Sequence, residues 1–158
     1  MKKIAANLSM LLIGLAITAA VTFAADSMVG TWKLNAAKSK FTGSFVVKSQ
    51  TDVREATPDG GVKVTREGQL ADGTPLKGSY TYNYDGKEYP VTGLAFDVLS
   101  VKRIDPNTTT FEVKKTGGKY HVTGQTVISA DGKTMTQTAK GTDADGKPIS
   151  STVVFDKQ

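Results

Sequence analysis

Two arginines stand in runs that otherwise alternate apolar and polar residues. Arg66 follows Val62 and Val64 at a spacing of two, and Arg103 occupies the same kind of position in a later run. Residues two apart lie on one face of a β-strand, so both guanidinium groups are candidates for the apolar face. A guanidinium there can bind a ligand carboxylate through two parallel hydrogen bonds. An internal salt bridge or a cap at the end of the fold are the alternatives, and Asp97 is the natural partner for Arg103.

Three tyrosines at the same spacing form a second candidate site. Tyr80, Tyr82 and Tyr84 alternate with small polar residues, so their rings share one face of a strand. Such a stripe can line a pocket, where each hydroxyl supplies a polar group on an apolar wall. A plain packed core and an exposed binding face stay open as alternatives. Together with Arg66 and Arg103, these tyrosines are the residues we predict to contact a ligand.

The sequence lacks the residues that catalysis or metal binding would need. It has one histidine, His121, and no cysteine. A zinc site therefore lacks ligands, and a serine nucleophile would depend on that histidine without a Gly-x-Ser-x-Gly turn to present it. A lone histidine can bind haem, but His121 alternates with Tyr120 and Val122, which favours a solvent-facing side chain. We expect a protein without enzymatic activity, metal or cofactor.

The first 24 residues have the composition of a secretory signal peptide. Lys2 and Lys3 precede an apolar stretch that ends at Phe23, and small residues favour cleavage after Ala24. An uncleaved membrane anchor is the alternative, since about 20 apolar residues can cross a bilayer. Without cysteine there is no site for a lipid anchor at the mature N-terminus. We therefore expect a periplasmic or secreted protein of bacterial type, with 25–158 as a single domain.

The charge pattern argues against nucleic acid as a partner. The chain has 20 Lys and Arg residues against 15 Asp and Glu, and removal of Lys2 and Lys3 leaves a net charge of about +3. The basic residues are scattered rather than interleaved with the aromatic platforms that single-stranded nucleic acid requires. After the leader, no stretch is apolar and long enough for a membrane-spanning helix.

Asp-Gly pairs divide the chain into short runs. They are Asp59-Gly60, Asp72-Gly73, Asp85-Gly86, Asp131-Gly132 and Asp145-Gly146. Asp-Gly suits a tight type I′ hairpin, whose two central residues both take positive φ. One helical turn is expected after the first strand, capped by Asn35. Nine strands are predicted, near 29–34, 44–55, 62–70, 76–84, 96–104, 108–115, 119–128, 134–141 and 149–155.

The pattern of these strands predicts an all-β fold. Most runs have one apolar and one polar face, as in an antiparallel sheet that is buried on one side. About eight to ten such strands suit an up-and-down meander that closes into a barrel. The interior of an eight-stranded barrel is filled by side chains or holds one small ligand. A two-sheet β-sandwich is the alternative.

The first predicted strand resembles that of the calycins, the group of lipocalins and fatty-acid-binding proteins. Its sequence is Gly30-Thr31-Trp32-Lys33-Leu34. The resemblance implies a lipocalin-like barrel in which Trp32 plugs one end. The whole mature chain is similar to small secreted bacterial proteins of lipocalin-like type, a group without a settled activity. Further motifs that carry this likeness are Lys38-Ser39-Lys40-Phe41, Tyr84-Asp85-Gly86-Lys87, Lys102-Arg103-Ile104-Asp105 and Asp131-Gly132-Lys133-Thr134-Met135-Thr136.

Two departures from the calycin pattern limit what is carried over. Fatty-acid-binding proteins place a helical pair between their first two strands, but only about ten residues separate Leu34 from Phe45. No such lid is expected here. Lipocalins stack a late arginine on the tryptophan, and the last predicted strand contains none. Arg103 is the nearest candidate to stack on Trp32 through a cation–π contact.

Two functions follow as expectations. The first is a non-enzymatic barrel that binds a small apolar or amphipathic molecule, such as a fatty acid, in its interior. The second is a protein-interaction or inhibitor barrel that acts through its loops. The segment from Lys87 to Ala95 is predicted as a long connection that exposes Tyr89, Val91 and Leu94. A proline-containing crossover packed over the barrel mouth is the alternative for that segment.

Overall fold

The described part of the chain is almost entirely β-structure. The computed structural model describes residues 26–158 except residue 44, so the predicted signal peptide at 1–24 lies outside the described residues. The elements are β1 (Gly30–Leu34), the 3-10 turn η1 (Ala36–Lys38), β2 (Lys40–Thr42), β3 (Val47–Ala56), β4 (Val62–Leu70), β5 (Pro75–Tyr82), β6 (Asp85–Thr92), β7 (Val98–Asp105), β8 (Thr108–Lys114), β9 (His121–Ile128), β10 (Thr134–Thr142) and β11 (Pro148–Lys157). No helix in residues 26–43 and 45–158 is long and apolar enough to cross a bilayer.

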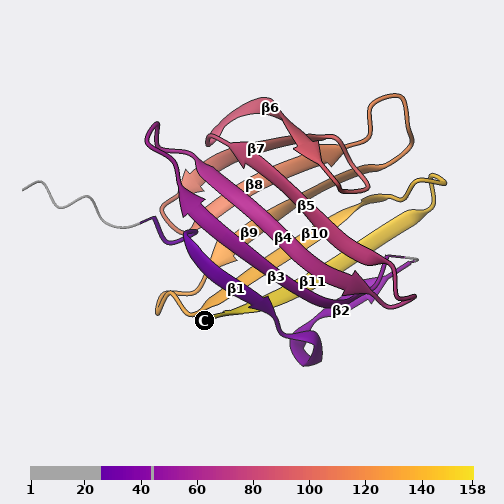
Figure 1. Cartoon of the computed structure of the whole chain (residues 1–158), viewed down its shortest axis with the longest axis horizontal. Helices are drawn as coiled ribbons and strands as arrows, with labels where there is room; N and C mark the ends of the chain where they lie inside the picture. Colours follow the sequence, from indigo (N-terminus) through magenta and orange to yellow (C-terminus); the bar gives the residue numbers. More distant parts are fainter. Residues whose placement is uncertain (1–25, 44) are drawn as a thin grey trace, which may run out of the picture.

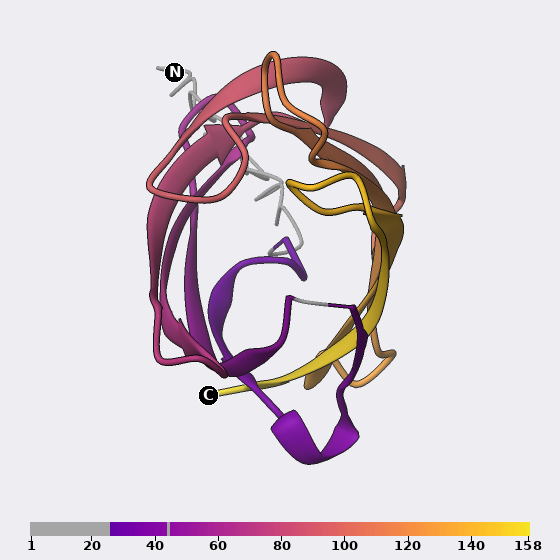
Figure 2. The ribbon, with the colours of Figure 1, turned by 90° about the vertical axis from the view of Figure 1, so that its right-hand side faces the viewer.

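Ten of these strands form a closed antiparallel barrel (Figures 1 and 2). From β3 to β11 each strand pairs with the next along the chain, β1 pairs with β3, and β1 also pairs with β11, which closes the ring. The short β2 pairs with β11 alone. The predicted up-and-down barrel is confirmed. The two-sheet sandwich is wrong, because the strands form one continuous closed sheet.

The sequence analysis missed β2 and β6. β6 covers most of the segment that was predicted as a long exposed connection. Pro90 lies in this segment, and proline argues against a strand because it disrupts β-ladders. The Val91 N–H donates to the Asp97 carbonyl beside β7 at 3.0 Å, so the preceding Pro90 directs its nitrogen away from β7. On that other side, the pairing of β5 with β6 ends at Tyr80 and Val91. The proline therefore costs no ladder hydrogen bond.

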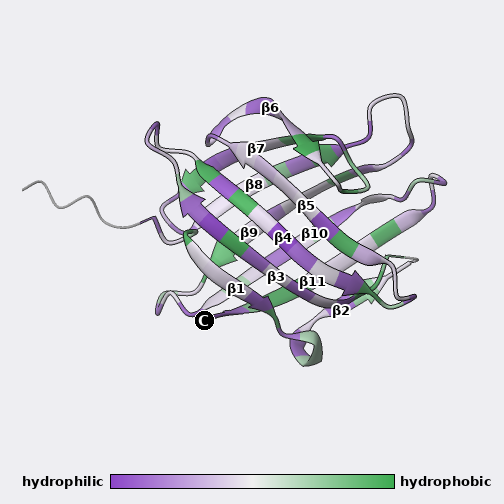
Figure 3. Cartoon of the chain, viewed as in Figure 1, coloured by the Kyte–Doolittle hydropathy of each residue, from purple (hydrophilic) through white to green (hydrophobic). Residues whose placement is uncertain are grey.

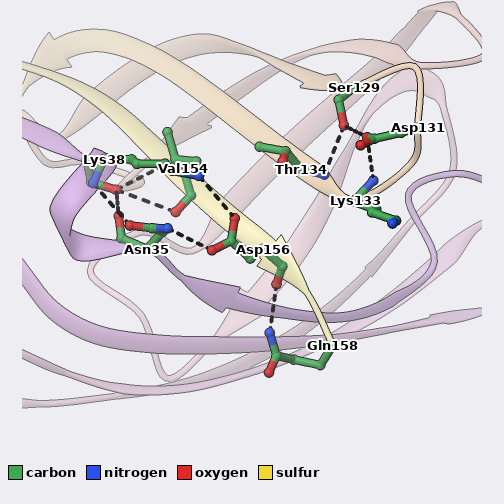
Figure 4. A network of polar contacts seen from close by, with 10 residues as sticks. Asn35, Lys38, Ser129, Asp131, Lys133, Thr134, Val154, Asp156 and Gln158 are labelled. Carbon is green, nitrogen blue, oxygen red and sulfur yellow. Dashed lines mark hydrogen bonds and ion pairs between the residues drawn. The ribbon is translucent and has the colours of Figure 1, made fainter.

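Four of the five Asp-Gly pairs lie in turns that reverse the chain, whereas Asp85-Gly86 forms the start of β6. The predicted type I′ geometry is wrong. Among the described residues only glycines have positive φ, so each Asp keeps a negative value. At the turn between β9 and β10, the Gly132 N–H donates to the Ser129 carbonyl at 2.8 Å and Gly132 has φ 69°. The Asp131 carboxylate accepts the Lys133 N–H at 3.1 Å (Figure 4). These are longer hairpin connections in which a left-handed glycine follows the turn.

The expected helical turn is confirmed as η1. The Asn35 side chain accepts the Lys38 N–H at 3.1 Å, which is the capping contact that was predicted. The same side chain donates to an Asp156 carboxylate oxygen at 2.7 Å, which ties η1 to β11 (Figure 4). This contact joins the two ends of the described chain where β1 and β11 close the ring.

The two ends of the barrel differ. At the end that carries the turns after β3 and β9, hereafter the closed end, a cluster of fully or nearly fully buried side chains fills the interior. Its members are Met28, Trp32, Ile128, Met135 and Phe155. The Trp32 indole N–H donates to the Met28 carbonyl at 3.0 Å. The opposite end, hereafter the open end, carries the turns after β4, β6 and β10. Apolar and polar residues alternate along many strands between the two ends (Figure 3).

Candidate functional site

The barrel encloses a cavity of about 150 Å³ that is apolar toward the open end and has polar groups along its walls. An engineered apolar cavity of similar volume holds benzene, so this space suits a molecule with a small apolar body. The apolar side chains around the mouth are Phe41, Phe45, Leu94, Phe96 and Ile149. The polar and charged side chains that line the interior include Gln50, Arg54, Arg66, Tyr80, Tyr82, Thr109, Tyr120, Thr126 and Gln137.

Arg66 lies inside the barrel, on the face that the sequence predicted. It is directly opposite Asp52 in the pairing of β3 with β4, and its Nε and Nη2 donate to the two carboxylate oxygens at 2.9 and 2.7 Å. Asp52 is completely buried and also accepts a hydrogen bond from Gln50 at 2.9 Å. Burial alone would raise the pKa of Asp52, but Arg66 holds that pKa below its ordinary value. The salt-bridge alternative for Arg66 is therefore realised.

A second guanidinium, that of Arg54, lies beside this pair and was missed by the sequence analysis. Its side chain is 4% exposed, and its Nη2 is 3.6 Å from Asp52 Oδ2, longer than a hydrogen bond. The Nε of Arg54 is buried without a hydrogen-bond partner within the described chain. Buried polar groups are nearly always hydrogen-bonded, and an unpaired one is costly. Arg54 thus brings an unused donor to the wall of the cavity.

Two of the three predicted tyrosines line the cavity. Tyr80 and Tyr82 stack with ring centroids 6.2 Å apart, and the Tyr80 hydroxyl accepts a hydrogen bond from Arg66 Nη2 at 3.2 Å. Burial raises the pKa of both phenols, so each keeps its proton and can donate it to an acceptor in the cavity. Tyr120, the residue before β9, adds a third buried phenol. Tyrosine and guanidinium donors therefore converge on one polar region.

The remaining two predicted ligand residues lie at the closed end, outside the cavity. Arg103 stacks on the ring of Tyr84, with Cζ 3.7 Å from the ring centroid, and its Nη2 is 2.6 Å from Asp26 Oδ2. Tyr84 donates to the same Asp26 oxygen at 2.7 Å. The predicted stacking of Arg103 on Trp32 is wrong, because the Asp26 carboxylate that precedes β1 draws the guanidinium away.

The contacts of Trp32 and of Asp97 also differ from the prediction. Lys157, at the end of β11, takes the place over the indole, with Nζ 5.1 Å from the ring centroid. Asp97 is not the partner of Arg103. Its carboxylate accepts hydrogen bonds from Lys115 at 3.0 Å and from the Thr116 N–H at 2.8 Å, at the open end. The sequence spacing placed Asp97 and Arg103 in one run, but they lie at opposite ends of β7.

The segment proposed as an exposed interaction loop is mostly packed. Val91 is buried in the barrel core, and Leu94 contacts the same core from the open end. Tyr89 is half-buried, and its hydroxyl contacts Asp85 at 3.1 Å. The predicted exposure of Val91 and Leu94 is therefore wrong, because most of the segment forms β6 rather than a loop. His121, in contrast, is exposed as predicted and contacts Glu112 at 2.7 Å on the outer surface.

The arrangement inside the barrel can bind and orient a molecule. It offers one unpaired guanidinium donor, protonated phenols and an apolar mouth, which together suit a ligand with one polar end. Sequence reasoning found Arg66, Tyr80 and Tyr82 because their strands alternate cleanly. It missed Arg54 and Asp52 because β3 carries polar residues on both faces, so alternation there does not identify the buried side.

Comparison with known proteins supports the fold. No protein-family profile matches the sequence, and no curated protein matches it. Among solved structures, the fluorescent protein UnaG superposes with a TM-score of 0.51 at 12% identity, over 84% of this chain and 98% of UnaG. The S-type phycobiliprotein lyase CPES from Guillardia theta superposes with a TM-score of 0.54 at 10% identity, over 84% of this chain and 89% of the lyase. At such identities the likeness supports the closed antiparallel β-barrel fold and no more.

Proposed function

We propose that this protein is a non-enzymatic, periplasmic or secreted barrel that holds a small amphipathic molecule in its interior. The observation that carries the proposal is the cavity of about 150 Å³, with apolar side chains at its mouth and polar donors in its walls. A core filled only by its own side chains would gain nothing from buried guanidinium groups, because their desolvation costs free energy. Fold alone does not decide function, and the two structural neighbours named above carry different names and roles.

The location outside the cytoplasm rests on the leader, which is a sequence-based proposal. Lys2 and Lys3 followed by an apolar stretch, with small residues before Ala25, favour export and cleavage. N-terminal sequencing of protein recovered from the periplasm or the medium should begin at Ala25. Recovery of the intact leader in a membrane fraction would contradict this part of the proposal and leave the binding function untouched.

Native mass spectrometry of the protein purified from its own secretion route tests the binding function directly. We expect a stoichiometric adduct that organic extraction releases and that identifies the ligand class. A bare mass, together with no saturable binding of small amphipathic probes to folded protein, would refute the proposal. A urea-unfolded sample is the control, because an adduct held by the cavity must disappear when the barrel opens.

A further inference from the structure

We infer that the ligand carries a single negative charge and that this charge binds to Arg54. The inference rests on the proposed binding function and names the chemical class of the ligand: a small monoanion, such as a carboxylate with a short apolar body. It assigns the binding of the anion to Arg54 on β3. Arg66, the arginine predicted from the sequence, instead pairs with Asp52 beside it.

The first argument is the balance of charge inside the barrel. Arg54 and Arg66 both line the cavity, and Asp52 is the only carboxylate within ion-pair distance of either one in the described chain. Two guanidinium groups against one carboxylate leave one positive charge. An uncompensated charge in a protein interior is costly, and a paired one is much less so. A monoanion in the cavity would bring the interior to neutrality.

The second argument is that Arg54, and not Arg66, has donors free to bind an anion. Asp52 gives its closest contacts to Arg66, with both carboxylate oxygens engaged at 2.9 and 2.7 Å. Arg54 is 3.6 Å from Asp52 and keeps a buried Nε without a partner in the described residues. A guanidinium binds a carboxylate best through two parallel N–H donors, and Nε is one of those donors. Arg54 therefore has the capacity that Arg66 has already used.

The third argument is the surroundings of Arg54. It lies near the closed-end terminus of β3. This strand runs next to β4 in the wall of the barrel (Figure 1). Burial raises the pKa of Tyr80 and of Tyr82, so both phenols stay protonated, and they line the same cavity as Arg54. The apolar mouth, which includes Phe45 and Leu94, lies toward the other end. A ligand would thus place its anionic group deep in the barrel and its apolar body toward the mouth.

Matched probes that differ only in charge test this inference. We would measure binding to the purified, ligand-stripped protein by isothermal titration calorimetry at neutral pH, with octanoate against octanamide and cinnamate against cinnamamide. Each pair keeps the apolar body and removes the charge. Charge-assisted hydrogen bonds are about twice as strong as neutral ones, so we expect each carboxylate to bind at least about tenfold more tightly than its amide. Octyl phosphate, a dianion above its second pKa, should bind more weakly than octanoate.

Arg54→Met should abolish the preference for the carboxylate and leave amide binding unchanged. Arg54→Lys, which keeps the charge but loses the fork, should retain a reduced preference. Arg103→Met is the matched control, because Arg103 is an inward guanidinium that lies outside the cavity, and it should keep the full preference. The ligand-free Arg54→Met protein should melt no lower than the wild type, since the substitution removes the excess positive charge of the interior and leaves Arg66 paired with Asp52.

The outcomes separate the two proposals. Equal binding of carboxylates and amides to the wild type would overturn the anion site but keep the binding function. The anion site would also be overturned by tighter binding of octyl phosphate, by a parallel loss of both probes in Arg54→Met, or by a fall in the melting temperature of that ligand-free variant. Absence of binding by all probes to folded protein would count against the binding function itself, and the inference would fall with it.

Discussion

Asp52→Asn removes the one carboxylate that both interior guanidinium groups share, and it changes almost nothing else in volume. In the native barrel Asp52 is completely buried and accepts three side-chain hydrogen bonds, at 2.9 and 2.7 Å from Arg66 and at 2.9 Å from Gln50. An asparagine oxygen can keep some of these contacts, but the amide end cannot accept a hydrogen bond. Arg54 and Arg66 would then repel each other without a counter-ion.

The expected loss of stability follows from this geometry. Removal of one partner from a buried ion pair costs about 3–5 kcal/mol, because the other charge stays buried and unpaired. A Coulomb estimate agrees, since two unit charges about 4 Å apart interact by about 4 kcal/mol at an effective dielectric constant of about 20. We therefore expect Asp52→Asn to lower the free energy of unfolding by about 3–5 kcal/mol, which is a large share of the total for a domain of this size.

Urea denaturation followed by the fluorescence of Trp32 measures this change, because that residue is the one tryptophan of the chain. Glu67→Gln is the matched control on the next residue of β4, where Glu67 pairs with Lys77 at 3.3 Å and both side chains are more than half exposed. An exposed pair contributes about 0–1 kcal/mol. If Asp52→Asn cost no more than Glu67→Gln at an unchanged m-value, the central role we assign to the buried pair would be refuted.

The pH dependence gives a second measurement on the same variant. The folded-state pKa of Asp52 lies below its ordinary value of 3.8, so its contribution to stability is complete above about pH 3.8. That contribution is lost as the pH falls from 3.8 through the lower folded-state value. The turn aspartates with lowered pKa values contribute in the same direction to both proteins. The stability difference between the wild type and Asp52→Asn should therefore shrink below about pH 3.8 and stay constant between about pH 5 and 7.

Three further substitutions test other parts of the fold. Trp32→Ala should cost about 3–5 kcal/mol because it empties the fully buried centre of the closed end, and a melting temperature close to that of the wild type would show that this ring closes no core. Gly124→Ala should cost about 1–3 kcal/mol, since the added Cβ would clash with the Thr138 carbonyl oxygen and lie 2.5 Å from Phe111 Cζ. Thermal melts beside the wild type check this, and an unchanged melting temperature would contradict the close packing. Arg103→Gln should release Asp26 and speed amide hydrogen exchange in residues 26–29 by at least about tenfold, while exchange in the barrel strands stays the same.

The fold could be predicted from the sequence because its signals are local. Glycines at the turns and residues that alternate over a few positions identify hairpins without any knowledge of distant contacts. The prediction missed β6 because proline usually excludes a residue from a β-strand, whereas here the tertiary pairing accommodates it. Pro90 is acceptable only because the ladder between β5 and β6 ends one residue away, and no feature of the sequence near Pro90 reveals where that ladder ends.

The interior charges show why the site was harder to predict than the fold. Gln50, Asp52 and Arg54 are buried in β3, while Val53 between them is exposed, so the usual link between apolar character and burial is reversed over residues 50–54. Only the pairing of Asp52 with Arg66 across β3 and β4 explains why a carboxylate is stable there. Once that pair is known, the second guanidinium has no counter-ion of its own. An anionic ligand is therefore inferred from a count of charges that only the closed barrel brings together.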